Sequence, residues 1–156
     1  MAQKAADLLV DLYQQDFSKK NHQVEIKRVL SPDSDFVLEF IEKNFNKRWV
    51  SESKSGLYKP QSTCFIAVDE KKIIGFACYD ATAKGFFGPM GVDPTYRGKG
   101  IGSSLVMACM EAMYHDGYGY AIIGSVSENI WHFYNQICGA KPIEDSRRLY
   151  SRLHDR

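Results

Sequence analysis

Apolar residues near the start of the chain recur at the three- and four-residue spacing of an amphipathic helix. The positions concerned are Ala5, Leu8, Leu9, Leu12 and Tyr13. This spacing predicts a helix that continues to about Gln15 and belongs to an N-terminal extension of residues 1–22. Residues 23–156 then form the core of a single domain.

The remaining pattern alternates between strands and helices. Strands are expected at residues 24–30, 64–68, 73–79, 86–92 and 120–126, with two short strands within 140–153. Helices are expected at 31–49, 101–115 and 129–138, and a polar loop at 51–61. The short charged link at 69–72 is typical of a hairpin, whereas Gly88 and Pro89 favour an irregular or splayed strand. This order predicts an α/β fold with a mixed sheet and helices on both faces.

Composition indicates one globular domain without a strong electrostatic preference. The chain has 156 residues, of which 44% are hydrophobic and 25% charged, enough for a substantial core. Lys and Arg number 20 against 19 Asp and Glu, so the net charge of +1 gives no electrostatic case for binding nucleic acid or an anionic membrane. With neither a long apolar run nor a secretory signal, the chain is expected to be cytoplasmic.

Four cysteines stand singly among hydrophobic residues, at Cys64, Cys78, Cys109 and Cys138. Their spacing does not match that of a zinc site, so no metal is expected. Free cysteine is among the most buried residue types in proteins. All four thiols are therefore expected to be buried and reduced.

A glycine-rich segment after the predicted strand 86–92 is the most informative part of the chain. Gly98, Gly100 and Gly102 open an amphipathic helix. Glycine lets the main chain approach a ligand closely, and a helix N-terminus offers unpaired N–H groups with a partial positive charge. Together with the charges of Arg97 and Lys99, this predicts a cradle for a pyrophosphate.

Three other nucleotide sites use glycine-rich turns. The dinucleotide fingerprint is not met, because its third glycine falls on Ser103. A Walker loop is not met either, because Gly100 follows Lys99 where a Ser or Thr is required. A methyl-donor nucleotide site tolerates looser glycine patterns and stays an alternative, although it normally follows the first strand of a parallel sheet.

The segment Arg97-Gly98-Lys99-Gly100-Ile101-Gly102, preceded by Val92-Asp93-Pro94, resembles the signature of the GCN5-related N-acetyltransferases, the GNAT family. The resemblance implies a mostly antiparallel mixed sheet, splayed at the strand before the glycine-rich turn. It implies an N-acetyltransferase that uses acetyl-CoA and no metal. The acetyl group would pass directly to a primary amine of a small acceptor in a ternary complex. A non-catalytic acyl-CoA-binding or regulatory module is the alternative.

The resemblance also implies roles for individual residues. Main-chain groups in two segments would bind acetyl-CoA: Met90, Gly91 and Val92 along the pantetheine, and Arg97, Gly98, Lys99, Gly100, Ile101, Gly102 and Ser103 at the pyrophosphate. Tyr134 matches the tyrosine that protonates the departing thiolate, and Asn129 the helix-opening asparagine, although its spacing to Tyr134 is shorter than usual.

The general base and the acceptor pocket are less determined. Candidate bases are Glu128, Asp80, His132 and a water chain held by backbone carbonyls and Ser125. Candidate acceptor residues are Trp49, Tyr79 and Phe87, together with Tyr58, Phe86, Lys47 and Arg48. The expected partner is a small amine, and sheet edges with the N-terminal helix are consistent with a homodimer.

Overall fold

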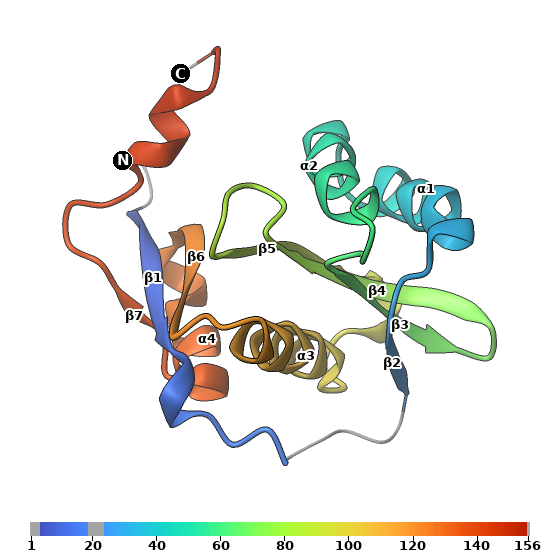
Figure 1. Cartoon of the computed structure of the whole chain (residues 1–156), viewed down its shortest axis with the longest axis horizontal. Coiled ribbons are helices and arrows are strands. Elements are labelled where there is room, and N and C mark those ends of the chain that lie inside the picture. Colours follow the sequence, from blue (N-terminus) through green and yellow to red (C-terminus); the bar gives the residue numbers. More distant parts are fainter. Residues whose placement is uncertain (1–3, 19–23, 156) are drawn as a thin grey trace.

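The computed structural model describes residues 4–18 and 24–155. These residues form a seven-stranded sheet in the order β2-β3-β4-β5-β6-β1-β7 (Figure 1). The strands are β1 (Ala5–Asp11), β2 (Glu25–Arg28), β3 (Cys64–Asp69), β4 (Lys72–Tyr79), β5 (Phe86–Val92), β6 (Tyr120–Ser127) and β7 (Lys141–Pro142). All neighbouring strands are antiparallel except β5 and β6, which are parallel. The predicted mixed, mostly antiparallel α/β fold is confirmed.

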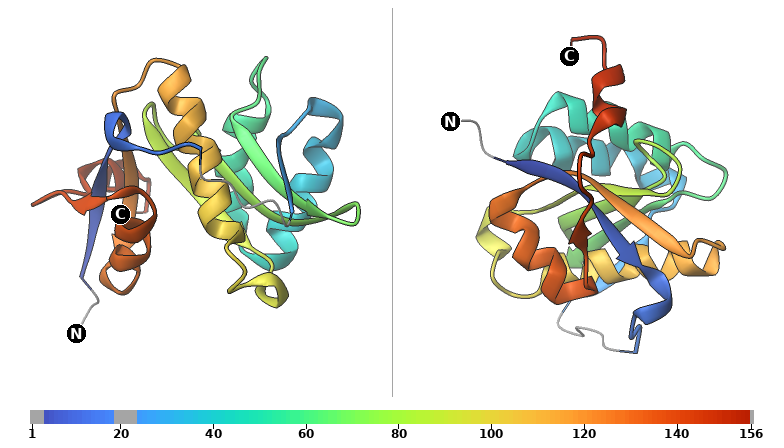
Figure 2. Two further views of the ribbon diagram at one scale, coloured as in Figure 1. Left: turned by 90° about the horizontal axis from the view of Figure 1, so that it is seen from below. Right: turned by 90° about the vertical axis from the view of Figure 1, so that its left-hand side faces the viewer.

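Helices cover both faces of the sheet (Figures 1 and 2). Helices α1 (Ser34–Asn44) and α2 (Lys47–Leu57) pack on β3, β4 and β5 from one side. Helices α3 (Ile101–His115) and α4 (Trp131–Cys138) pack on the other side, α3 mainly on β3, β4 and β5 and α4 on β1 and β7. Each face therefore has its own hydrophobic core.

The helix predicted at the start of the chain is wrong, because the described part of that segment forms strand β1 and a single 3-10 turn (Leu12–Gln14). β1 lies inside the sheet, antiparallel to β6 on one side and to β7 on the other. Leu8, Val10 and Leu12 are buried at every second position, whereas Leu9 is 41% exposed. The same apolar residues satisfy a helical spacing and an alternating one, and the two neighbouring strands decide between them.

The single helix predicted at 31–49 is two helices, and the polar loop predicted at 51–61 is mostly the second of them. The break lies at Phe45 and Asn46. The Asn46 side chain accepts a hydrogen bond from the main-chain N–H of Trp49 at 2.9 Å, which caps α2. Because α2 is polar on its outer face, its composition alone does not distinguish it from a loop.

Two further expectations need correction. Of the two strands predicted within 140–153, only β7 forms, and a 3-10 helix (Arg148–Arg152) follows it. Cys64 and Cys78 are not reduced thiols but form a disulfide between directly opposed positions of β3 and β4. Cys109 and Cys138 are free and buried, as predicted.

Candidate functional site

The strands β5 and β6 separate after a short parallel contact. They pair only at Phe86 with Ile122 and Phe87 with Ile123. Beyond these residues β5 continues along β4 as far as Val92, while β6 continues along β1 as far as Ser127. The edge of β5 that faces β6 is therefore unpaired from Gly88 onward, and the predicted splay is confirmed.

The glycine-rich turn connects β5 to α3 and has the local geometry of an anion cradle. Gly98 and Gly100 have φ values of +81° and +79°, which only glycine adopts readily. The first hydrogen bond of α3 runs from the Ser104 N–H to the Gly100 carbonyl at 3.2 Å. The N–H groups of Ile101, Gly102 and Ser103 precede that bond, so helix geometry leaves them available to a ligand.

Surrounding contacts keep the turn beside the unpaired strand edge. A Cβ placed on Gly102 would lie 3.5 Å from Phe133 of α4 and 3.8 Å from both Met90 and Val92 of β5. A Cβ on Gly98 would meet no atom within 4 Å, so the main chain there faces open space. The described residues thus fit the diphosphate and pantetheine of acetyl-CoA.

The charged and apolar residues of the turn have different environments. Arg97 is exposed, and the Lys99 ammonium lies over the Tyr96 ring, 5.3 Å from its centre. Ile101 is only 2% exposed and anchors the first turn of α3 in the core. Gly91 accommodates Phe45 on the other face of the sheet, because a Cβ there would lie 2.3 Å from the ring.

A cavity of about 840 Å³ lies where β5 and β6 diverge. Its walls come from α2, the β4–β5 loop, both diverging strands, α4 and the C-terminal 3-10 helix, and they include Trp49, Glu52, Thr82, Phe87, Met90, Ser125, Tyr134 and Tyr150. Lys47 and Arg48 also line it, whereas Tyr58 and Phe86 do not. A second cavity, of about 1130 Å³, lies along α3; Gly100 and Ser103 of the glycine-rich turn line it, whereas none of the predicted acceptor residues does.

Tyr134 lies in the wall of the 840 Å³ cavity and is 9% exposed. Its ring packs edge-on against Phe87, with centres 6.3 Å apart, and against Phe133 at 5.0 Å. Burial, followed by the neighbouring Cys138, raises the pKa of Tyr134 well above its ordinary value. The phenol therefore keeps its proton at physiological pH and can donate it.

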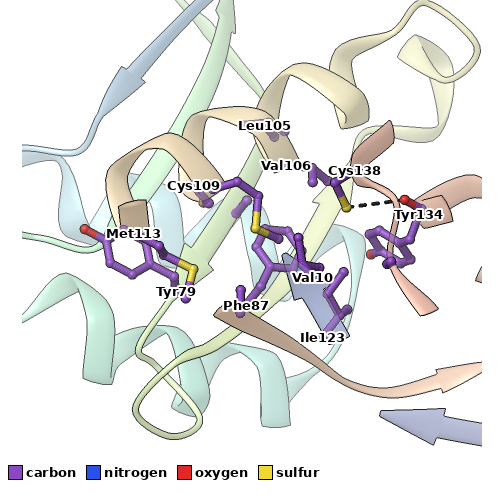
Figure 3. Packing of buried hydrophobic residues seen from close by; sticks show 14 of the residues in the cluster. Val10, Tyr79, Phe87, Leu105, Val106, Cys109, Met113, Ile123, Tyr134 and Cys138 are labelled. Atoms are coloured by element: carbon purple, nitrogen blue, oxygen red, sulfur yellow. Dashed lines mark hydrogen bonds between the residues drawn. The ribbon is translucent and has the colours of Figure 1, made fainter. Parts of the chain in front are cut away.

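Tyr79 does not belong to the cavity, although the sequence suggested it as an acceptor residue. It lies at the opposite end of the core cluster from Tyr134, with Phe87 between them (Figure 3). Its hydroxyl donates to Asp116 at 2.7 Å and accepts from Arg28 at 3.3 Å. Tyr79 therefore has a structural role, because its hydroxyl connects Arg28 of β2 with Asp116 at the end of α3.

The bases suggested by the sequence also lie outside the cavity walls. Glu128, Asn129 and His132 are exposed at the start of α4 and the turn before it. The Asp80 carboxylate accepts hydrogen bonds from the Tyr118 hydroxyl at 2.9 Å and the Gly85 N–H at 2.7 Å. Among the residues suggested for the proton transfer, Ser125 lines the cavity, whereas Glu128, Asp80 and His132 do not.

Glu52 is a cavity carboxylate that sequence reasoning missed. It is partly buried on α2 and accepts a hydrogen bond from the Thr82 hydroxyl. Desolvation raises the pKa of Glu52, and the bond from Thr82 lowers it in part. A titratable group with a raised pKa in a cleft is typical of a functional site. The signal was hidden because the segment was interpreted as a polar loop.

Tyr150 is the second residue that sequence reasoning missed. It comes from the C-terminal 3-10 helix, and its hydroxyl lies directly over Gly124 of β6, where a Cβ would be only 1.9 Å away. Burial, followed by the charges of Glu52 and Asp7, raises the pKa of Tyr150 to about 12. The cavity wall therefore contains two phenols that keep their protons, Tyr134 and Tyr150.

The part of the chain that the structure describes contains no helix long and apolar enough to cross a membrane. Within the same residues, no group of three or more His, Cys, Asp or Glu side chains is arranged to hold a metal ion.

Comparison with known proteins agrees with this geometry. Residues 7–140 match the model of the acetyltransferase (GNAT) family, so the match begins within β1. No curated protein matches the chain. Similar solved structures include a GCN5-related N-acetyltransferase from Sphaerobacter thermophilus (19% identity, TM-score 0.71, 89% of this chain and 48% of that one). Another is the glucosamine N-acetyltransferase region of a fungal multi-domain beta-N-acetylglucosaminidase (15%, 0.70, 89% and 20%).

A third is a ribosomal-protein-alanine N-acetyltransferase from Brucella melitensis biovar Abortus 2308, with 15% identity and a TM-score of 0.58 over 77% of this chain and 94% of that one. At these identities the likeness concerns the fold alone. The chain spans between a fifth and about half the length of the first two structures. Because the family model covers most of the chain, the protein belongs to the acetyltransferase (GNAT) family.

Proposed function

We propose that this protein is an N-acetyltransferase that moves the acetyl group of acetyl-CoA to the primary amine of a small acceptor by direct transfer in a ternary complex. The observation that carries the proposal is the continuity of three features. The start of α3 lies beside β5, since a Cβ on Gly102 would be 3.8 Å from Met90, and both Met90 of the unpaired β5 edge and Tyr134 line the 840 Å³ cavity. Acetyl-CoA supplies the activated carbonyl that an amine attacks.

The donor side of the site binds acetyl-CoA and orients its thioester. The N–H groups of residues 101–103 hold the pyrophosphate, assisted by the partial positive charge of the helix N-terminus. Main-chain groups of Met90, Gly91 and Val92 pair with the pantetheine as an additional strand would. Tyr134 donates a hydrogen bond and then its proton to the departing thiolate; the raised pKa keeps the phenol protonated until that step.

The acceptor side of the site removes a proton from the incoming ammonium. We assign this role to Glu52, because it lies in the cavity wall and the predicted Glu128 does not. The raised pKa of Glu52 brings its basicity closer to that of the amine. Trp49, from the same helix, offers an aromatic wall that suits a cationic amine.

Two measurements test the proposal. Acetyl-CoA should raise the thermal unfolding midpoint, and CoA should be released when an amino sugar, a polyamine or a peptide with an N-terminal alanine is added. Tyr134→Phe should lower kcat about tenfold or more with an unchanged acetyl-CoA Kd. Tyr58→Phe, an exposed tyrosine outside the cavity, is the matched control. Unchanged turnover in Tyr134→Phe contradicts the role of this residue.

A non-catalytic acyl-CoA-binding module is the second candidate. It is favoured by the absence of a carboxylate from β5, the strand beside the thioester. Such a module would bind acetyl-CoA saturably and release no CoA with any amine of the panel. Calorimetry with S-adenosylmethionine in place of acetyl-CoA tests the remaining nucleotide alternative, which predicts the opposite preference.

A further inference from the structure

The carboxylate of Asp7 connects three parts of the chain that are far apart in sequence. Asp7 belongs to β1 and is 7% exposed. Its Oδ1 accepts a hydrogen bond from the Ser125 N–H of β6 at 2.8 Å. Its Oδ2 accepts one from the N–H of Arg147, in the C-terminal segment, at 3.1 Å. One buried side chain therefore joins the N-terminal strand, the splayed strand and the C-terminus.

Both residues that donate to the Asp7 carboxylate have unfavourable backbone conformations. Ser125 has a φ of +51° and Arg147 a φ of +79°, in the left-handed region that non-glycine residues rarely adopt. Such conformations persist only where surrounding contacts over-determine them. Here the contacts are the two carboxylate oxygens, reinforced by a bond from Arg147 Nε to the Ser125 hydroxyl at 3.2 Å.

A second pair of bonds holds the C-terminal segment against β1. The Asp7 N–H donates to the Ser146 hydroxyl at 2.8 Å, and the Ile143 N–H donates to the Asp7 carbonyl at 2.8 Å. The main-chain N–H, the main-chain carbonyl and Oδ2 of Asp7 thus all bind residues 143–147, while Oδ1 binds β6. The position of that turn sets the start of the next 3-10 helix.

The turn at Arg147 determines where Tyr150 lies. The Tyr150 N–H donates to the Arg147 carbonyl at 3.1 Å, which fixes the first turn of the 3-10 helix. The helix then places the Tyr150 hydroxyl over Gly124, one residue before the Ser125 that Asp7 also holds. Asp7 therefore holds both the segment that carries Tyr150 and the part of β6 over which Tyr150 lies.

We propose that Tyr150 contacts the acceptor in the cavity and that Asp7 is the positioning residue that holds Tyr150 there. The inference rests on the proposed function, because it assigns a role in the acceptor side of the same site. Tyr150 lines the cavity with Glu52 and Ser125, away from the glycine-rich turn. Its hydroxyl can donate a hydrogen bond to the acceptor while Glu52 accepts the proton of the amine.

The first test asks whether Tyr150 affects binding of the acceptor amine without affecting binding of acetyl-CoA. The wild-type protein is assayed with the amino sugar, the polyamine and the alanyl peptide, and the best amine is kept as the probe. Tyr150→Phe should raise the KM for that amine about tenfold, the effect of losing one hydrogen bond, and change the acetyl-CoA Kd less than twofold. A KM for the amine within twofold of wild type overturns the inference.

The second test asks whether Asp7 acts through Tyr150. Asp7→Asn keeps one acceptor oxygen and replaces the other with an NH2 group that faces an N–H donor. It should raise the amine KM as Tyr150→Phe does, and the double variant should show no further increase. Fully additive effects on the amine KM overturn the positioning role. Asp145→Asn, in the same segment but exposed and paired with Arg148, is the matched control.

Two readouts keep this inference distinct from the proposed function. The unfolding midpoint of Asp7→Asn is measured without ligand, so that a loss of stability is separated from a loss of positioning. A wild-type protein that transfers acetyl groups while Tyr150→Phe has an unchanged amine KM overturns only the inference. A wild-type protein that releases no CoA with any of the three amines overturns both.

Discussion

The donor half and the acceptor half of the site are built in different ways. The donor half is nearly continuous in sequence, from β5 through the glycine-rich turn and α3 to Tyr134 of α4. The acceptor half is assembled from α2, the β4–β5 loop and the C-terminal 3-10 helix, and β1 holds the last of these in place. A half that binds through local main-chain geometry can be identified in a sequence, whereas a half that depends on distant segments cannot.

The largest effect is expected in the acceptor half, from Glu52→Gln. Without a general base, kcat/KM should fall about 100-fold or more. In the wild type, log kcat/KM should rise with pH until Glu52 ionises, at a pH above the ordinary carboxyl pKa, because only the carboxylate accepts a proton. Glu52→Gln should lose this acidic limb of the profile.

The Glu52→Gln variant should lose activity but not stability. A folded-state pKa that is raised means that the stabilising contribution of Glu52 is present below its ordinary pKa and is lost as pH rises through the folded value. At neutral pH, Glu52→Gln should therefore unfold at the same or a higher temperature. Glu42→Gln, exposed on α1, is the control. Full activity in Glu52→Gln contradicts its role as base.

A large effect on folding is expected from the strand that supports the acceptor half. Leu8→Ala removes a side chain that is 0% exposed and should cost about 3 kcal/mol of unfolding free energy, measured in urea. Leu9→Ala, at the neighbouring position that is 41% exposed, should cost less than about 1 kcal/mol. Equal costs at the two positions would contradict the alternation of β1 and favour a helix.

In the donor half, Gly102→Asp tests the main-chain cradle. A carboxylate beside the pyrophosphate should weaken acetyl-CoA binding by about 30-fold or more, measured by calorimetry. The fold should tolerate the change, because the Cβ would meet its neighbours at 3.5 Å or more and an acidic residue suits the first turn of a helix. Gly102→Asn, of the same size without charge, is the control. Equal affinities in the two variants would place the pyrophosphate elsewhere.

The smallest effect is expected from Asp155→Asn. Asp155 forms an ion pair with Arg48 of α2, but the two side chains are 45% and 54% exposed. An exposed pair contributes less than about 1 kcal/mol, so the unfolding midpoint and the amine KM should barely change. A large rise in the amine KM would show that this pair, rather than Asp7, holds the C-terminal segment.

Much of the donor half was predictable from the sequence. The strand 86–92, the glycine-rich turn and the helix from Ile101 follow from patterns within a few residues, whereas Tyr134 was identified by the resemblance to the GNAT family. Gly98 and Gly100 carry positive φ values because the turn requires them there, and this requirement appears in the sequence as glycine.

The acceptor half was not predictable for a physical reason. Glu52 was assigned to a loop, because the outer face of α2 is polar and only packing on the sheet makes it a helix. The position of Tyr150 depends on the turn at Ser146 and Arg147, and both of these residues bind Asp7, more than 130 positions earlier in the chain. Such a hydrogen bond leaves no periodicity in the sequence.

By itself, the sequence determined the class of fold and the glycine-rich turn, because these depend on backbone propensity and local spacing, and its resemblance to the GNAT family pointed to Tyr134. Only the tertiary structure decided that residues 5–11 form an inner strand, because the apolar residues of that segment satisfy either periodicity until β6 and β7 supply hydrogen-bond partners. The same structure placed Glu52 and Tyr150 in the wall of one cavity and Asp7 against the segment that carries Tyr150. Contacts between distant segments are a property of the folded chain, and burial and pKa follow from them.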